Sequence, residues 1–164
     1  MSLKRSGRIF SASCLSLSCF CNLSLEKFCF EISGKNLGID RCQFNRNSGR
    51  VTGDDALKEL SAIINECIKD KGTGYHFYGD EFYIILKETD EAIIKNLAEH
   101  IRLELAKKQI LHESSKVDEY LTVSQAYVIA PDVKVPDEFS KLFKMVDEVL
   151  NDVKEKGRNA YKIV

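Results

Sequence analysis

The spacing of apolar residues changes along the chain, and each spacing predicts a different kind of element. Apolar residues three or four positions apart are typical of amphipathic helices, and this period covers residues 53–71, 90–108 and 136–156. Short alternating or continuous apolar runs are typical of strands, and they cover residues 28–32, 75–78, 82–86, 121–130 and 160–164. The predicted order is strand, helix, hairpin, helix, strand, helix and strand.

Polar and turn-forming residues mark the expected helix ends. Thr52 and Asp54 are both candidate N-terminal caps of the first helix. Pro136 suits the first turn of the third helix, and Gly157 is placed to end it. These residues agree with the boundaries that the apolar period predicts.

The order of elements predicts one α+β domain of the ferredoxin-like or palm type, with a central, mostly antiparallel sheet flanked by helices. A length of 164 residues fits a single domain. The regular pattern begins at residue 25, so we expect the domain over 25–164 and a poorly ordered leader or linker over 1–24. This first segment resembles a secretory signal only weakly, because several serines and Asn22 interrupt its apolar stretch. For the same reason it predicts no membrane span.

Composition narrows the function classes. The formal net charge is −1, so no overall basic field favours nucleic acid as a partner. The chain has six cysteines without a CxxC pair, and its three histidines lie far from the N-terminal cysteine cluster, which argues against a zinc site. We expect reduced thiols in a cytoplasmic protein.

The predicted hairpin carries the first candidate chemistry, in Gly79, Asp80 and Glu81. One interpretation is a tight turn in which glycine supplies a positive φ. The other is a rigid pair of carboxylates that holds Mg²⁺ on a substrate triphosphate. Glu31, in the predicted strand 28–32, is a second candidate metal ligand if that strand pairs with the hairpin.

Two further segments carry polar side chains near helix ends. Asp54 lies where a loop is expected to meet a helix. One interpretation is a negative charge that is favourable at the helix start, and the other is an acceptor of hydrogen bonds from guanine N1–H and N2–H. Asn45 would add an amide to the same base edge. Lys154 and Arg158 are favoured at a helix C-terminus on electrostatic grounds alone, and their spacing also suits two ligands of phosphate oxygens.

Together these segments resemble the GGDEF domain of diguanylate cyclases. The family has a GHxxGD segment, the GGDEF hairpin, a TxSxG strand and a final ADxxLYxAKxxGRN helix. The corresponding segments are GRVTGD at residues 49–54, YGDEF at 78–82, TVSQA at 122–126 and VDEVLNDVKEKGRN at 146–159. The resemblance covers about residues 28–164 and implies a nucleotidyl-cyclase-like palm fold.

The resemblance also implies roles for the acidic residues of the hairpin. Asp80 and Glu31 match the family's ligands of Mg²⁺ or Mn²⁺, which binds together with the nucleotide. Asp80 and Glu81 would be the catalytic residues, with Gly79 beside the substrate phosphates. In such enzymes two domains face each other, and the 3′-hydroxyl of one GTP attacks the α-phosphate of the other to give cyclic di-GMP.

The remaining matches concern the substrate. Asn45 and Asp54 match the pair that reads guanine, and Lys154 and Arg158 match the residues that bind the triphosphate.

Several positions depart from the family pattern. Tyr78 replaces the first glycine of the hairpin, Ser33 the second aspartate of the metal-binding strand, and Arg46 and Arg50 an aspartate and a histidine. The RxxD inhibitory site that many family members carry would fall at residues 69–72, which read KDKG. We therefore expect cyclase activity to be absent or low, with no tight cyclic di-GMP site at 69–72.

The leading hypothesis is a regulatory module that binds GTP or a related guanine nucleotide in cyclic di-GMP signalling. It would lie beside a sensor domain or an EAL-type phosphodiesterase domain. Two alternatives stay open, namely an active diguanylate cyclase and a dimerisation module without a ligand.

Overall fold

The structure is a computed structural model that describes residues 10–11, 27–28, 32–33, 50–78, 80–87, 90–112, 115–131 and 136–164. Its elements are, in chain order, β1 (Phe10–Ser11), β2 (Lys27–Phe28), β3 (Ile32–Ser33), α3 (Arg50–Cys67), β4 (Gly72–Tyr78), β5 (Glu81–Leu86), α4 (Glu91–Lys107), β6 (Ser124–Tyr127), β7 (Ala130–Pro131), α5 (Pro136–Glu155) and β8 (Tyr161–Ile163).

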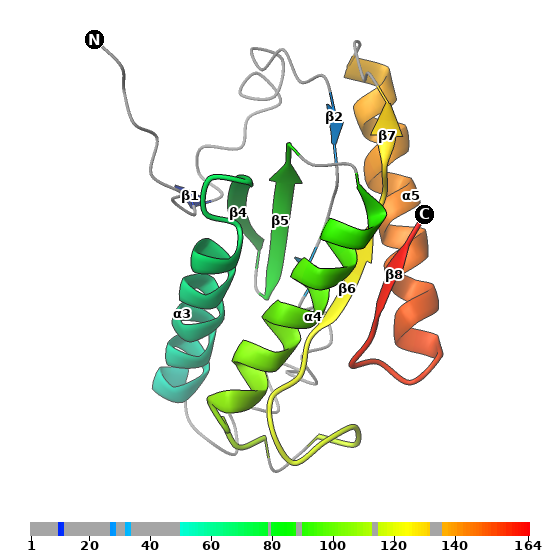
Figure 1. The fold of residues 1–164 in the computed structure, drawn as a ribbon. Helices are drawn as coiled ribbons and strands as arrows, with labels where there is room; N and C mark the ends of the chain where they lie inside the picture. Colours follow the sequence, from blue (N-terminus) through cyan, green and yellow to red (C-terminus); the bar gives the residue numbers. More distant parts are fainter. Residues whose placement is uncertain are drawn as a thin grey trace, which may run out of the picture.

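A six-stranded sheet in the order β1-β4-β5-β3-β6-β8 forms the centre of the molecule (Figure 1). The pairs β4–β5, β5–β3 and β3–β6 are antiparallel, whereas the outer pairs β1–β4 and β6–β8 are parallel. Strands β2 and β7 form a separate antiparallel pair. The expected α+β fold with a mostly antiparallel sheet is confirmed.

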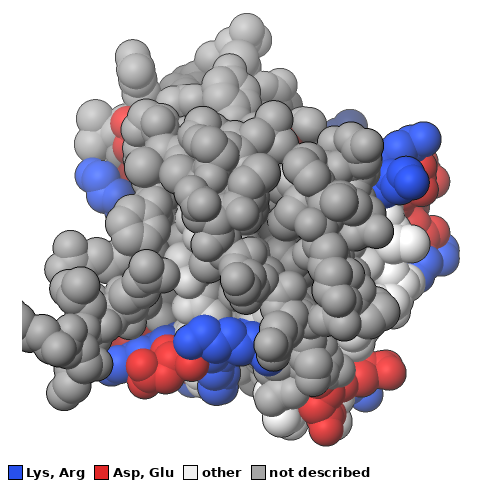
Figure 2. Space-filling model, turned by 90° about the horizontal axis from the view of Figure 1, so that it is seen from above, with Lys and Arg blue, Asp and Glu red and all other residues white. Residues whose placement is uncertain are grey.

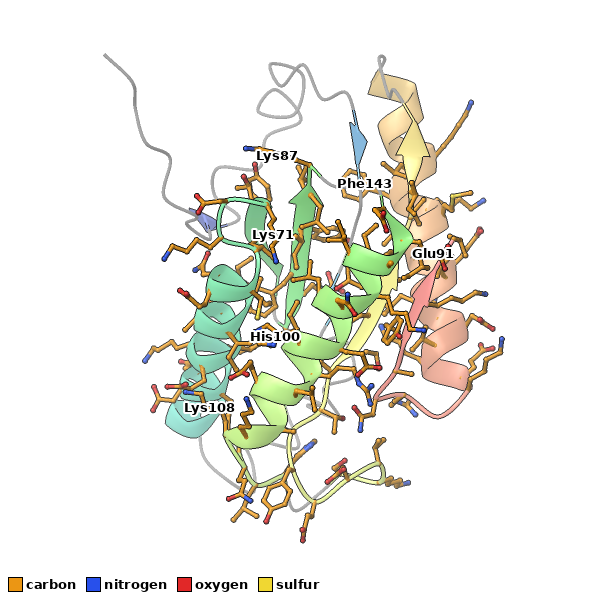
Figure 3. All side chains as sticks on the ribbon, viewed as in Figure 1. Lys71, Lys87, Glu91, His100, Lys108 and Phe143 are labelled. Atoms are coloured by element: carbon orange, nitrogen blue, oxygen red, sulfur yellow. The ribbon has the colours of Figure 1, made fainter. Side chains whose placement is uncertain are left out.

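Helices cover both faces of this sheet. The alternation of side chains in β5 shows the two layers, because every residue of this strand is buried. Phe82, Ile84 and Leu86 pack in one apolar cluster with residues of α3 and α4. Tyr83 and Ile85 pack in another with residues of α5. Figure 3 shows Phe143 on the sheet-facing side of α5, where its ring meets that of Tyr83 edge to face at 5.3 Å.

The helix boundaries confirm two predictions and correct one. Helix α4 begins after Asp90, whose carboxylate accepts hydrogen bonds of 2.8 and 3.3 Å from two backbone N–H groups of the first turn. Helix α5 begins at Pro136 and ends just before Gly157, which has a φ of 116°. Helix α3, however, begins at Arg50, so Thr52 and Asp54 lie inside it and the predicted caps are wrong. Gly53 is a poor helix former that suggested a later start, but it is buried within the helix.

Two predicted strands are divided between the two sheets. The run 28–32 contributes β2 to the small sheet and β3 to the central one, and the run 121–130 contributes β6 and β7 in the same way. Apolar alternation does not specify a partner strand, so it could not show this change of sheet. Pro131, expected to end a strand, pairs with Lys27 in the small sheet. Within the range expected as a leader, residues 10–11 pair with β4.

Surface charge and cysteine chemistry add little to the fold. Figure 2 shows lysine and arginine interspersed with aspartate and glutamate among the described residues of the face that it presents. Of the six cysteines, Cys67 lies among the described residues, where it is buried and free. Burial raises the pKa of its thiol to about 11. No helix in the described ranges is long and apolar enough to cross a membrane.

Candidate functional site

The β4–β5 hairpin brings the two candidate carboxylates to one end of the sheet. Tyr78 and Glu81 are opposite each other in register, and Asp80 lies in the turn between them. The register shifts between His76 and Tyr78, so the strand is irregular just before the turn. The predicted hairpin is confirmed, whereas Gly79 lies outside the described residues.

Three strands place their residues in one row at this end. Glu81 pairs with Ser33, and Ser33 pairs in turn with Ser124. Opposite residues of antiparallel strands point to the same face of a sheet. Because Phe82 packs against α3 and α4, its neighbour Glu81 faces the α5 layer, where this residue is 7% exposed.

Ser124 was not singled out from the sequence. Its side chain is 1% exposed, and its Oγ has no hydrogen-bond partner within the described part of the chain. A buried hydroxyl is costly without a partner, so Ser124 adds a polar group to this buried end of the sheet. Only the structure could show this, because the TVSQA segment reads equally well as an ordinary strand.

Lys154 brings a positive charge to the same face. Along α5 the buried residues Val146, Leu150 and Lys154 follow one another at intervals of four, so Lys154 continues the apolar stripe that packs on the sheet. The residue is 7% exposed, which is rare for a lysine. Figure 1 shows the last turn of α5 at the same end of the sheet as the start of β5.

Arg158 follows in a turn with unusual backbone geometry. Gly157, Arg158 and Asn159 have φ values of 116°, 63° and 45°, three left-handed residues in succession. The Arg158 N–H donates to the Val153 carbonyl at 3.1 Å, a bond typical of a helix that ends in a left-handed glycine. The Arg158 side chain has no hydrogen bond or ion pair among the described residues.

Asp54 also lies at this end of the molecule. It is in the second turn of α3, half-buried, and its carboxylate makes no hydrogen bond within the described ranges. Its neighbour Asp55 is exposed and pairs with Lys58 at 2.7 Å. Asp54 is therefore available to a ligand in a way that Asp55 is not.

The structure thus places five of the eight candidate residues at one end of the sheet, namely Asp54, Asp80, Glu81, Lys154 and Arg158. Glu31, Asn45 and Gly79 lie outside the described residues. The described residues contain no group of three histidine, cysteine or acidic side chains that would hold a metal alone. Mg²⁺ needs only one or two carboxylates when substrate phosphates and water complete its shell, so the hairpin carboxylates fit such an ion.

Comparison with known proteins shows similarity over most of the chain. The family model for the diguanylate cyclase GGDEF domain matches residues 40–160. Diguanylate cyclase A of Treponema denticola is 25% identical over 115 residues, which are 70% of this chain and 30% of that protein. Diguanylate cyclase DosC of Escherichia coli K12 is 27% identical over 121 residues, which are 74% of this chain and 25% of that protein. The chain thus spans less than a third of the length of these curated relatives.

Solved structures share the fold. The GGDEF domain of DgcB from Caulobacter crescentus, solved with cyclic di-GMP, has a TM-score of 0.69 and 20% identity, and covers 99% of this chain and 98% of its own. The active GGEEF domain of a Vibrio cholerae diguanylate cyclase has a TM-score of 0.64 and 24% identity, over 84% and 81% of the two chains. The palm-type fold expected from the resemblance is confirmed. Because the family model covers most of its length, this chain belongs to the GGDEF domain family.

Proposed function

We propose that this domain binds GTP or a related guanine nucleotide with Mg²⁺ or Mn²⁺, and that it serves as a regulatory module in cyclic di-GMP signalling. One observation carries the proposal: a buried lysine, Lys154, lies at the same end of the sheet as the carboxylates Asp80 and Glu81. A buried lysine at the same end of the sheet as a buried and a half-buried carboxylate suits a magnesium nucleotide, which presents phosphate oxygens and a cation together.

The charges divide into two groups with different tasks. Lys154 and Arg158 would hold triphosphate oxygens from the α5 side, since ammonium and guanidinium groups donate charge-assisted hydrogen bonds to phosphate. Asp80, with Glu31, would hold the metal ion, which would neutralise phosphate charge. Asp54 and Asn45 would accept and donate hydrogen bonds at the guanine edge. The Arg158 guanidinium has no partner among the described residues, which supports its proposed role in holding triphosphate oxygens.

Low or absent turnover is part of the proposal, and Tyr78 is the main reason for it. A glycine at this hairpin position lets the main chain approach the phosphates, whereas tyrosine restricts the backbone and adds volume. Misplacing reacting atoms by an ångström costs on the order of a hundredfold in rate. Ser33 and Arg46 remove two further acidic groups from the family pattern.

An active cyclase is the second candidate function. Asp80 and Glu81 are both retained, and curated relatives such as DosC are named diguanylate cyclases. Turnover needs two domains facing each other, so the assay requires high protein concentration. Clear formation of cyclic di-GMP from GTP and Mg²⁺ by the unmodified chain would overturn the regulatory proposal in favour of this candidate.

Calorimetric titration with GTP and Mg²⁺ tests binding directly. We expect saturable binding that Lys154→Met weakens about tenfold to a hundredfold, because one charge-assisted hydrogen bond is lost while the aliphatic stem remains. Lys144→Met is the matched control, since Lys144 is an exposed lysine of the same helix, paired at 3.8 Å with Glu148. Absence of GTP binding by the unmodified chain would leave a ligand-free dimerisation module as the function.

A regulatory module acts on a partner whose activity it changes. A sensor or phosphodiesterase domain is the neighbour that this proposed role calls for. A change in GTP occupancy would then alter how this neighbour packs or works.

A further inference from the structure

The turn that carries Arg158 is held from the opposite face of the sheet. Two residues of this turn, Arg158 and Asn159, are left-handed although they are not glycines. Because a side chain disfavours this conformation, they need support from the surrounding structure. Arg102 of α4 supplies that support. Its Nε and Nη2 both donate to Oδ1 of Asn159, at 3.3 Å each, across 57 residues of sequence.

Arg102 is itself fixed in place. Its Nη1 donates to Oε2 of Glu99 at 2.9 Å, one turn earlier in α4. The Arg102 side chain is only 27% exposed, so this ion pair is partly shielded from water and geometrically restricted. These three hydrogen bonds leave the planar guanidinium little rotational freedom, which makes it a rigid support for Asn159.

The orientation of Arg158 depends on this support. Within the described residues the Arg158 side chain has no hydrogen-bond or ion-pair partner, so the backbone of the turn sets the direction in which this side chain leaves the chain. That backbone is fixed on one side by the bond from the Arg158 N–H to the Val153 carbonyl and on the other by the Asn159 side chain.

We propose that Arg102 is a positioning residue, which clamps Asn159 so that the left-handed turn directs Arg158 toward the nucleotide triphosphate. The triphosphate part of this inference rests on the proposed function. The structural part, in which Arg102 holds the Arg158 turn, is independent of the proposed function.

A small cavity gives experimental access to the clamp. It has a volume of about 160 Å³, and its wall includes Arg102, Asn159, Glu99 and Asp118. Removal of the Arg102 side chain would enlarge this cavity toward Asn159. A free guanidinium ion would then fit between Glu99 and Asn159 and replace the missing group.

The first test compares Arg102→Ala with Lys107→Ala. Lys107 is the matched control, because it is also a cation of α4 paired with a glutamate three residues earlier, at 2.6 Å, but it lies among exposed groups. We expect Arg102→Ala to weaken GTP about fivefold to tenfold, the effect of losing two long charge-assisted hydrogen bonds. Guanosine, which has no phosphates, should bind both variants as it binds the unmodified chain.

Rescue and a second variant separate positioning from general damage. Millimolar guanidinium chloride should restore GTP binding to Arg102→Ala, and an equal concentration of sodium chloride should not. Asn159→Gly removes the acceptor but keeps a residue that adopts positive φ, so it should weaken GTP to a similar extent. The double variant should be no weaker than either single variant, because the two residues act as one unit. Additive losses, or equal losses for GTP and guanosine, would overturn the proposal.

Amide hydrogen exchange without nucleotide tests the structural part independently. Arg102→Ala should increase exchange at the Arg158 amide at least several-fold, while the amides of β5 stay protected. Unchanged exchange at Arg158 would overturn the proposal even if GTP binding fell. If the unmodified chain does not bind GTP, the proposed function fails, and this exchange measurement still decides whether Arg102 holds the turn.

Discussion

Replacing Asp54 with alanine tests how the domain distinguishes guanine from adenine. Asp54 lies in the second turn of α3 rather than at its start, so the substitution removes no helix cap. Its carboxylate makes no hydrogen bond within the described residues, and alanine is the best helix former. The variant should therefore fold normally, and a change in nucleotide affinity would reflect a lost contact with the base.

The expected magnitude follows from the chemistry of the base edge. A carboxylate can accept guanine N1–H and N2–H together, and hydrogen bonds to charged groups contribute about 1.5–3 kcal/mol each. Because Asp54 is half-buried and partly solvated, we expect a total loss below the sum of two such bonds, about 1.5–3 kcal/mol, or roughly tenfold to a hundredfold in Kd. Adenine has no donor at either position, so ATP affinity should not fall.

The assay is a pair of calorimetric titrations, with GTP and with ATP, in the presence of Mg²⁺. Asp55→Ala is the control, because Asp55 is the next residue of the same helix but is exposed and paired with Lys58. Asp55→Ala should leave both affinities unchanged. An equal loss for GTP and ATP in Asp54→Ala would refute the base-reading role, and equal effects of the two substitutions would show a nonspecific effect of charge.

Two further predictions concern the fold around the site. A Cβ at Gly72 would overlap the carbonyl oxygen of Ile85, so Gly72→Asp, which supplies the aspartate of the family's RxxD site, should lower the Tm by roughly 3–10 °C without creating tight cyclic di-GMP binding. Tight cyclic di-GMP binding by that variant in calorimetry would contradict this reasoning. Hydrogen bonds from Lys156 and Lys162 hold the pKa of Asp152 below its ordinary value of 3.8. A carboxylate whose pKa is lower in the folded state than in the unfolded chain stabilises the fold at pH values above its unfolded pKa. The unmodified protein should therefore have a higher Tm than Asp152→Asn at neutral pH, and this difference should shrink as the pH falls below 3.8. A Tm difference between the unmodified protein and Asp152→Asn that is independent of pH would refute this role of the Asp152 carboxylate.

Local patterns predicted most of the fold because they reflect local physics. The apolar stripe of α4 and the capping carboxylate of Asp90 both act within a few residues, so the helix could be delimited from sequence. The hairpin around Asp80 follows in the same way from two apolar runs and a turn. Helix α3 was placed too late because Gly53 weakens local helix propensity, while its burial in the packed helix overrides that preference.

The rest of the candidate site depends on contacts between distant residues. Nothing near Arg102 in sequence indicates that it supports Asn159, and the pairing of Ser33 with both Glu81 and Ser124 appears only when the sheet is assembled. The apolar stripe of α5 could have drawn attention to Lys154, since a lysine at a stripe position is unusual. The sequence instead indicates Lys154 through its place at the helix C-terminus and in the VDEVLNDVKEKGRN segment.

The separation of core and site explains how a member of this family can change its hairpin and keep its fold. In β5 the residues from Phe82 to Leu86 anchor the strand in both apolar layers, whereas Asp80 lies in the turn beyond them. Tyr78, which stands where the family has a glycine, lies opposite Glu81 at the hairpin end, where the proposed function places the substrate phosphates. Lys154 and Arg158 belong to α5 and its terminal turn, which the sheet and the Arg102 clamp hold independently of the hairpin. In the proposed function, the cations that would hold the phosphates and the altered hairpin position therefore lie on different elements, so a change at Tyr78 leaves Lys154 and Arg158 in place.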